Sequence, residues 1–78
     1  MKTELTERLE RITYMETLFD RALSGDHSVL PELEEYYHSP LWLADYEADE
    51  AGLLPPGLKR GVLSEDGVYH LLTSVNEP

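Results

Sequence analysis

One long stripe of apolar side chains limits what this 78-residue chain can fold into. Between Thr3 and Leu23, large apolar residues recur at steps of three and four, which places them on one face of an α-helix. These residues are Leu5, Leu9, Ile12, Met15, Phe19 and Leu23. The spacing predicts a helix over residues 3–24, about 30 Å long. Most of the remaining chain must therefore serve to cover it.

The length of this helix also favours a homodimer. A chain of this size buries only about 60 to 65% of the surface that its unfolded form exposes. The segments after Leu23 are therefore short of material to cover the whole stripe. We expect part of the face of residues 3–23 to contact a second copy of the protein.

Three shorter helices are predicted at residues 28–38, 40–51 and 65–75. Ser39-Pro40 is the clearest start signal, because serine is a good N-cap and proline fits the first helical position. Ser64 caps the last helix in the same way. The apolar side of the helix at 40–51 is predicted to consist of Leu41, Trp42, Leu43 and Tyr46.

Two consecutive prolines, Pro55 and Pro56, interrupt the chain between the last two helices. Proline removes a backbone donor and disfavours helix in the residue before it, so this segment cannot be helical. It is predicted to be an ordered connector, because we expect its leucines to need burial. They are Leu53, Leu54 and Leu58.

The pattern shows no strand, repeat or domain boundary. We therefore predict one all-α domain over residues 1–78. It is a small bundle of one long N-terminal helix and three shorter helices, with the Pro-Pro connector before the last of them.

Charge and composition disfavour several classes of function. The formal net charge of −10 repels phosphate backbones and anionic lipid surfaces, so we expect no direct nucleic-acid or membrane partner. The longest apolar run, residues 41–44, is far shorter than the roughly 20 residues of a membrane span. The chain has no cysteine and begins with acidic residues where a signal peptide is apolar. We expect a cytoplasmic protein.

The residues that resemble catalytic or metal sites have simpler explanations. Asp45, Glu47 and Asp49 match the first three ligands of a calcium loop, but Glu50 stands where the loop requires glycine. No two of the three histidines have ligand spacing on a helix, and Ser64 is explained as a cap rather than a nucleophile. We expect no catalytic residue, no metal site and no cofactor, and hence no enzyme.

The basic doublet Lys59-Arg60 follows a stretch that carries no lysine or arginine after Arg21. Arg60 is suited to bind the carboxylate of Asp45 or Asp49 and so fasten the connector to the helix at 40–51. The alternative is an anion-binding element at the start of the last helix, although acidic residues already occupy that position. The pattern leaves both open.

A candidate binding or clamp surface follows from this doublet and from the surplus of aromatic residues, whose polar tips suit an interface. Its predicted members are Trp42, Asp45, Tyr46, Asp49, Lys59, Arg60 and Tyr69.

Three segments carry a resemblance to a known family. They read YYHSPLWLADYEADE at residues 36–50, GLLP at 52–55 and LKRGVLSEDGVY at 58–69, followed by Leu71 and Leu72. Over residues 36–72 the chain resembles a bacterial family of short proteins catalogued as a domain of unknown function, number four-two-nine-eight of that series. The resemblance implies a small, intracellular, largely helical protein to which no activity is attached.

The function favoured by these patterns is a non-enzymatic protein-protein interaction or accessory module that self-associates. One alternative is a small-ligand or divalent-metal binding protein, with a pocket between the helix at 40–51, the connector and the last helix. Trp42, Tyr46, Arg60 and Tyr69 would line that pocket. A further alternative is an acidic mimic of nucleic acid, which rests on charge alone.

Overall fold

A computed structural model describes residues 3–76 and contains four α-helices and two short 3-10 helices. Within these residues there is no strand. In chain order the elements are α1 (Glu4–Leu23), η1 (His27–Val29), α2 (Leu30–Tyr37), α3 (Pro40–Glu50), η2 (Gly61–Leu63) and α4 (Glu65–Asn76). The prediction of an all-α fold with one long and three shorter helices is confirmed.

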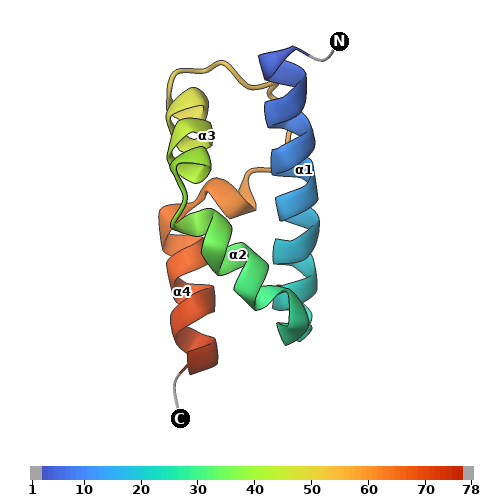
Figure 1. The fold of residues 1–78 in the computed structure, drawn as a ribbon, viewed down its shortest axis with the longest axis vertical. Coiled ribbons are helices and arrows are strands. Elements are labelled where there is room, and N and C mark those ends of the chain that lie inside the picture. Colours follow the sequence, from blue (N-terminus) through green and yellow to red (C-terminus); the bar gives the residue numbers. More distant parts are fainter. Residues whose placement is uncertain (1–2, 77–78) are drawn as a thin grey trace.

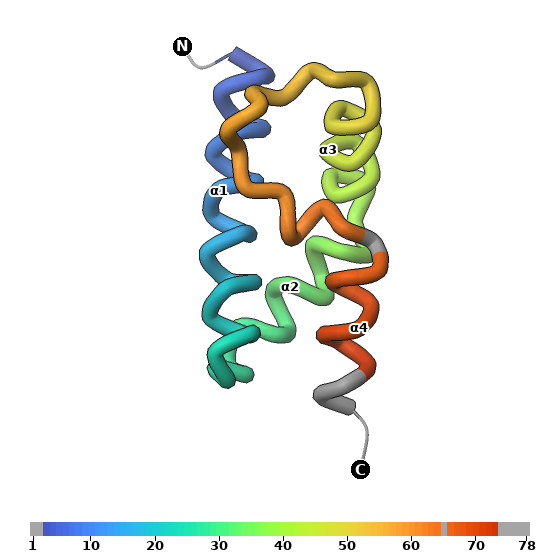
Figure 2. The backbone as a smooth tube through the Cα atoms, turned by 180° about the vertical axis from the view of Figure 1, so that it is seen from behind, coloured from blue at the N-terminus to red at the C-terminus, as the bar shows by residue number. Residues whose placement is uncertain are grey.

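The helices form an elongated bundle of 44 × 23 × 23 Å. In Figure 1, α1 runs along one side, α3 and α4 lie end to end along the other, and α2 crosses obliquely between the two sides. Figure 2 shows the opposite face, where the connector leaves α3, descends along α1 and turns back through η2 to α4. Through η2, this segment packs against α1.

Local signals set the ends of these helices. The Thr3 side chain caps α1 by accepting a hydrogen bond from Thr6 N, and Ser39 caps α3 by accepting one from Trp42 N. Gly25 and Gly52 follow α1 and α3 with positive φ angles of 104° and 73°, which favour glycine. Ser64 Oγ accepts from Gly67 N at the start of α4.

The middle of the α1 stripe is covered by the same chain. Ile12 and Phe19 are buried, and Leu9 and Met15 are partly buried against the core. Leu5 and Leu23, at the two ends of the stripe, remain 45% and 61% exposed. A second copy of the protein would therefore have apolar surface of the stripe to cover only at the ends of α1. The homodimer stays a prediction.

Two predicted apolar faces are wrong in detail. The buried residues of α3 are Trp42, Asp45 and Ala48, whereas Leu41 and Leu43 are each 51% exposed. The helix is rotated in this way because the face carrying Asp45 turns toward arginines of α1.

In the connector, Leu54 is buried and Leu58 is partly buried, but Leu53 is 62% exposed. Adjacent side chains of a non-helical segment point to different sides, so only one of the two neighbouring leucines can face the core.

Candidate functional site

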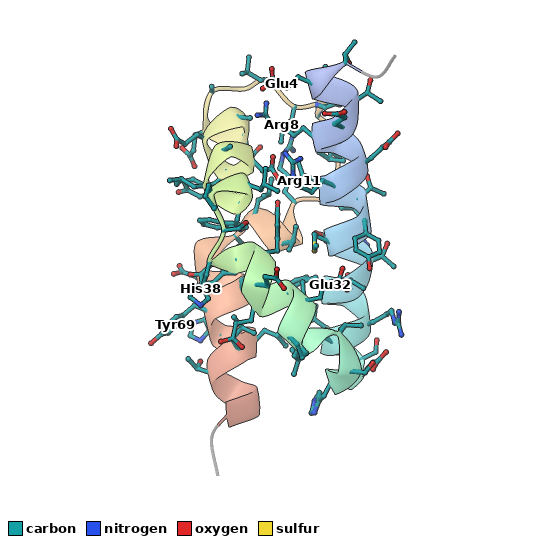
Figure 3. All side chains as sticks on the ribbon, in the orientation of Figure 1. Glu4, Arg8, Arg11, Glu32, His38 and Tyr69 are labelled. Carbon is teal, nitrogen blue, oxygen red and sulfur yellow. The ribbon has the colours of Figure 1, made fainter. Side chains whose placement is uncertain are left out.

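A buried carboxylate, that of Asp45, lies where α1, α2 and α3 meet. Its side chain is 0% exposed. Arg11 donates from Nε to Oδ2 (2.9 Å) and from Nη2 to Oδ1 (2.6 Å), and Arg8 Nε donates to Oδ1 (3.1 Å). The Tyr36 hydroxyl donates to Oδ2 at 2.6 Å. We call these four residues the Asp45 cluster, and Figure 3 shows Arg8 and Arg11 directed from α1 into the space beside α3.

The positions of the cluster follow from helix geometry. Arg8 and Arg11 are three residues apart, so they project from neighbouring positions on one face of α1. Arg8 also reaches the exposed Glu4, at 3.6 Å. Glu4 and Glu7 stand four residues before Arg8 and Arg11, so the sequence offers each arginine a nearer partner on the same helix and does not reveal their shared partner in α3. The signal that could have revealed it is that both arginines flank the apolar stripe of α1.

The contacts of the cluster shift the pKa values of two of its members, Arg11 and Tyr36. Hydrogen bonding to Asp45 raises the pKa of Arg11 above its ordinary value. Burial, followed by the hydrogen bond to Asp45, raises the pKa of Tyr36. With four donors on its two oxygens and no exposed surface, the Asp45 carboxylate is a structural anchor rather than a free base. Asp45, one of the predicted members of the binding or clamp surface, therefore lies in the interior, where it joins helices.

The basic doublet divides between two partners. Arg60 Nε forms a close ion pair with Asp49 Oδ1, at 2.6 Å, and Arg60 Nη2 donates to the carbonyl oxygen of Pro55. Lys59 points instead to α1, where Nζ lies 2.8 Å from Asp20 Oδ2 at the surface. Of the two partners considered for Arg60, the structure places Asp49 beside it, whereas Asp45 belongs to the buried cluster.

The aromatic residues of the predicted surface are not gathered in one place. Trp42 is buried, and its Nε1 donates to the carbonyl oxygen of Val62 at 2.9 Å, which fastens α3 to η2. Tyr46 stacks on Trp42 with ring centroids 5.2 Å apart, and Tyr37 meets Trp42 edge-on. Tyr69 is 57% exposed on α4 and projects away from the bundle (Figure 3). Trp42 thus holds the scaffold together.

Sequence reasoning also missed a second buried carboxylate, that of Glu16. It is 7% exposed and accepts a hydrogen bond from Val62 N at 2.8 Å, so α1 holds η2 in place. Gly61 lies tightly against this contact: a Cβ there would be 2.8 Å from Glu16 Oε1 and 3.0 Å from a ring carbon of Phe19. Glycine at this position therefore permits the close approach of η2 to α1.

Two of the surface depressions formed by the described residues bear on the predicted site. The larger, about 580 Å³, lies between α1, α2 and the start of α3. The second, about 370 Å³, lies between α3, Arg60 and the start of α4, where a ligand pocket was expected. Tyr46 and Arg60 line it with Asp49, but the buried Trp42 and the outward Tyr69 do not. The larger depression, with Arg11 and Tyr36 in its wall, was not predicted.

Two further findings concern the described part of the chain. Residues 3–76 contain no group of three or more histidine or acidic side chains placed to hold a metal ion. No helix within them combines the length and the apolar character needed to cross a membrane.

Comparison with known proteins places the chain in a family. No curated protein and no solved structure matches it. A family model does match, over residues 1–78, and so extends the resemblance seen at residues 36–72 to the N-terminal helix. The chain therefore belongs to the family described as "Domain of unknown function (DUF4298)".

Proposed function

We propose that this protein is a non-enzymatic interaction module that binds another protein through its acidic and partly apolar surface. The proposal rests on a contrast between the interior and the surface. The buried polar groups of the Asp45 cluster are hydrogen-bonded within the chain, whereas large apolar side chains remain exposed on the surface. Among the side chains that the structure describes, seven large apolar ones are 45% to 62% exposed. They are Leu5, Tyr14, Leu23, Leu41, Leu43, Leu53 and Tyr69. Aromatic and aliphatic side chains of this kind supply the anchors of protein interfaces.

The charge of the surface favours a partner with basic residues. The chain has 16 acidic and six basic residues. The five basic residues within 3–76 each pair with a carboxylate of the same chain, at Asp45, Asp26, Asp20 or Asp49. The excess negative charge therefore has no internal counterpart, and it steers a basic partner toward the molecule.

The same contacts weigh against the small-ligand alternative. Arg60, which would hold an anionic ligand in the depression beside α4, already pairs with Asp49. The neighbouring Glu50 and Asp66 would repel an anion. Trp42 fluorescence, followed during titration with divalent cations and phosphorylated metabolites, tests this alternative, and a saturable change would favour it.

Site-specific cross-linking in the protein's own cells tests the proposed function. A photoreactive amino acid placed at an exposed apolar position, Leu41 or Leu43, should trap a second protein as an adduct of defined mass. The same amino acid at the buried Val68 is the control and should trap none. The absence of any adduct from all exposed positions at native expression would refute the proposal.

Light scattering of the purified protein tests self-association separately. A mass of two chains would make a second copy the partner. A mass of one chain at high concentration would remove the homodimer and leave the binding of a different protein to be decided by cross-linking.

A further inference from the structure

We infer that the groove between α1, α2 and the start of α3 binds an amphipathic segment of a partner protein, one that presents a large apolar side chain next to a lysine or arginine. This inference rests on the proposed function, and it names the surface and the chemistry of the partner.

The apolar part of the groove comes from three elements. Met15 of α1, Pro31 of α2 and Leu41 of α3 line a depression of about 580 Å³. That volume is comparable to those of small-molecule binding clefts, about 300 to 1,000 Å³, so the depression has room for a large side chain. Leu41 is 51% exposed, so contact with a partner would remove apolar surface from water.

The charged part of the groove is acidic. Glu32 and Glu35 lie three residues apart on α2 and therefore share a side of that helix, and both line the groove. A hydrogen bond with Glu32 raises the pKa of Tyr14, which places this carboxylate at the junction of α1 and α2. The one basic residue in the lining, Arg11, is already paired with Asp45. A basic side chain can lay its apolar stem on Met15 or Leu41 and its charged end near Glu35.

Part of the wall of the groove is held by the Asp45 cluster. Arg11 and Tyr36 line the groove and are both hydrogen-bonded to the buried Asp45. Their side chains are thus fixed before a partner arrives, which reduces the entropy lost on binding.

A second copy of the chain suits the groove less well than a different protein. Every arginine and lysine within residues 3–76 already pairs with a carboxylate of its own chain. Two copies, each with a formal charge of −10, also repel each other. The groove therefore requires basic side chains that are not already paired, and residues 3–76 offer no such arginine or lysine.

Peptide binding by the full chain, with matched charge variants, tests the groove. The probe is a fluorescein-labelled amphipathic peptide of leucine and lysine, and binding is followed by fluorescence anisotropy. Glu35 lines the groove, whereas Glu34 is its exposed neighbour on the same helix and does not. We expect Glu35→Lys to weaken binding by about tenfold or more because it places like charges together at the contact, and Glu34→Lys to change it less than about threefold.

A second matched pair tests the apolar contact. Leu41 and Leu43 are equally exposed on α3, but only Leu41 lines the groove. Leu41→Ser should weaken binding by about tenfold, whereas Leu43→Ser should leave it nearly unchanged. All four positions are on the surface, and matching thermal unfolding curves will show that the variants fold.

The outcomes separate the inference from the proposed function. If the two variants of each matched pair weakened peptide binding equally, the groove would not be the binding site. A general attraction of the acidic surface for basic partners would remain possible. Equal binding of a peptide with glutamate in place of lysine would overturn the required charge. No binding of the lysine peptide at millimolar concentration would overturn the inference altogether. The proposed function fails only if cross-linking in cells also traps no protein.

Discussion

The Asp45 cluster and the Lys59-Arg60 doublet are two ways in which an acidic chain can use its few cations. In the cluster, two arginines and a tyrosine surround a carboxylate with no exposed surface and join three helices. In the doublet, Lys59 and Arg60 extend from the connector and pair with separate carboxylates that are partly exposed to solvent, on α1 and α3. The chemical groups are alike, and the main difference is their access to water.

That difference decides what each pair contributes. Exposed ion pairs are screened by water and salt and add little to stability. In a buried cluster, removal of one member leaves charges that were taken out of water without a partner, and the loss is large. The net benefit of forming the cluster is much smaller than the cost of breaking it. The following predictions test this comparison, from the largest expected effect to the smallest.

Asp45→Asn should cause the largest loss. The substitution keeps the size of the side chain but leaves Arg8 and Arg11, which are only 17% and 23% exposed, without their counter-charge. We expect the free energy of unfolding to fall by about 3 to 5 kcal/mol. Urea denaturation measures it, and Asp49→Asn is the matched control at the surface. Similar losses for the two variants would contradict the comparison.

Tyr36→Phe should have an intermediate effect, because it removes one of the donors to Asp45. We expect a loss of about 1 to 2 kcal/mol at neutral pH. Thermal unfolding at pH 7 measures it. A loss as large as that of Asp45→Asn would mean that the hydroxyl, rather than the arginines, holds the carboxylate.

Tyr36→Phe should also change how the stability of the fold depends on alkaline pH. Folding raises the pKa of Tyr36, so above pH of about 10 the unfolded chain releases a proton that the folded chain keeps. This stabilisation is complete below pH of about 10 and declines as the pH rises above it. Unfolding measured between pH 8 and 11 should show a shallower alkaline decline for Tyr36→Phe than for the natural sequence. Parallel curves would contradict the raised pKa.

Arg60→Ala should cost about 0.5 to 1 kcal/mol, because Arg60 and Asp49 are partly exposed, at 33% and 27%, and solvent screens their attraction. In the double variant with Asp49→Ala, the loss of stability should be smaller than the sum of the losses of the two single variants. Strictly additive losses would show that the 2.6 Å contact contributes nothing.

Lys59→Ala should have the smallest effect. The bond to Asp20 raises the pKa of Lys59, but the side chain is 70% exposed. We expect its thermal midpoint to match that of the natural sequence within error in both low and high salt. A clear fall in the thermal midpoint that disappears in high salt would show that the ion pair of Lys59 with Asp20 does stabilise the fold.

The parts of the fold that the sequence predicts are those set by near neighbours. Ser39 and Pro40 define the start of α3 and Gly52 its end, because capping and positive φ act within a few residues. The periodicity of α1 predicts Ile12 and Phe19 in the core for the same reason.

The candidate site was less predictable because it depends on residues far apart in the chain. Arg8 and Arg11 are 37 and 34 positions from Asp45, and both have nearer acidic residues that match a helical pair. Glu16 looks equally like a solvent-facing residue until η2 brings Val62 N against it. Only the packing of the helices distinguishes an acid on the surface from one that becomes buried.

The burial of Asp45 also has a consequence for how the chain reaches its native state. Any compact arrangement that docks α3 in another register would strand this carboxylate in an apolar interior without Arg8, Arg11 and Tyr36. Such misfolded bundles are raised in energy even when their apolar surfaces pack equally well. We expect the cluster to favour a single topology over competing compact states, at the cost of some stability.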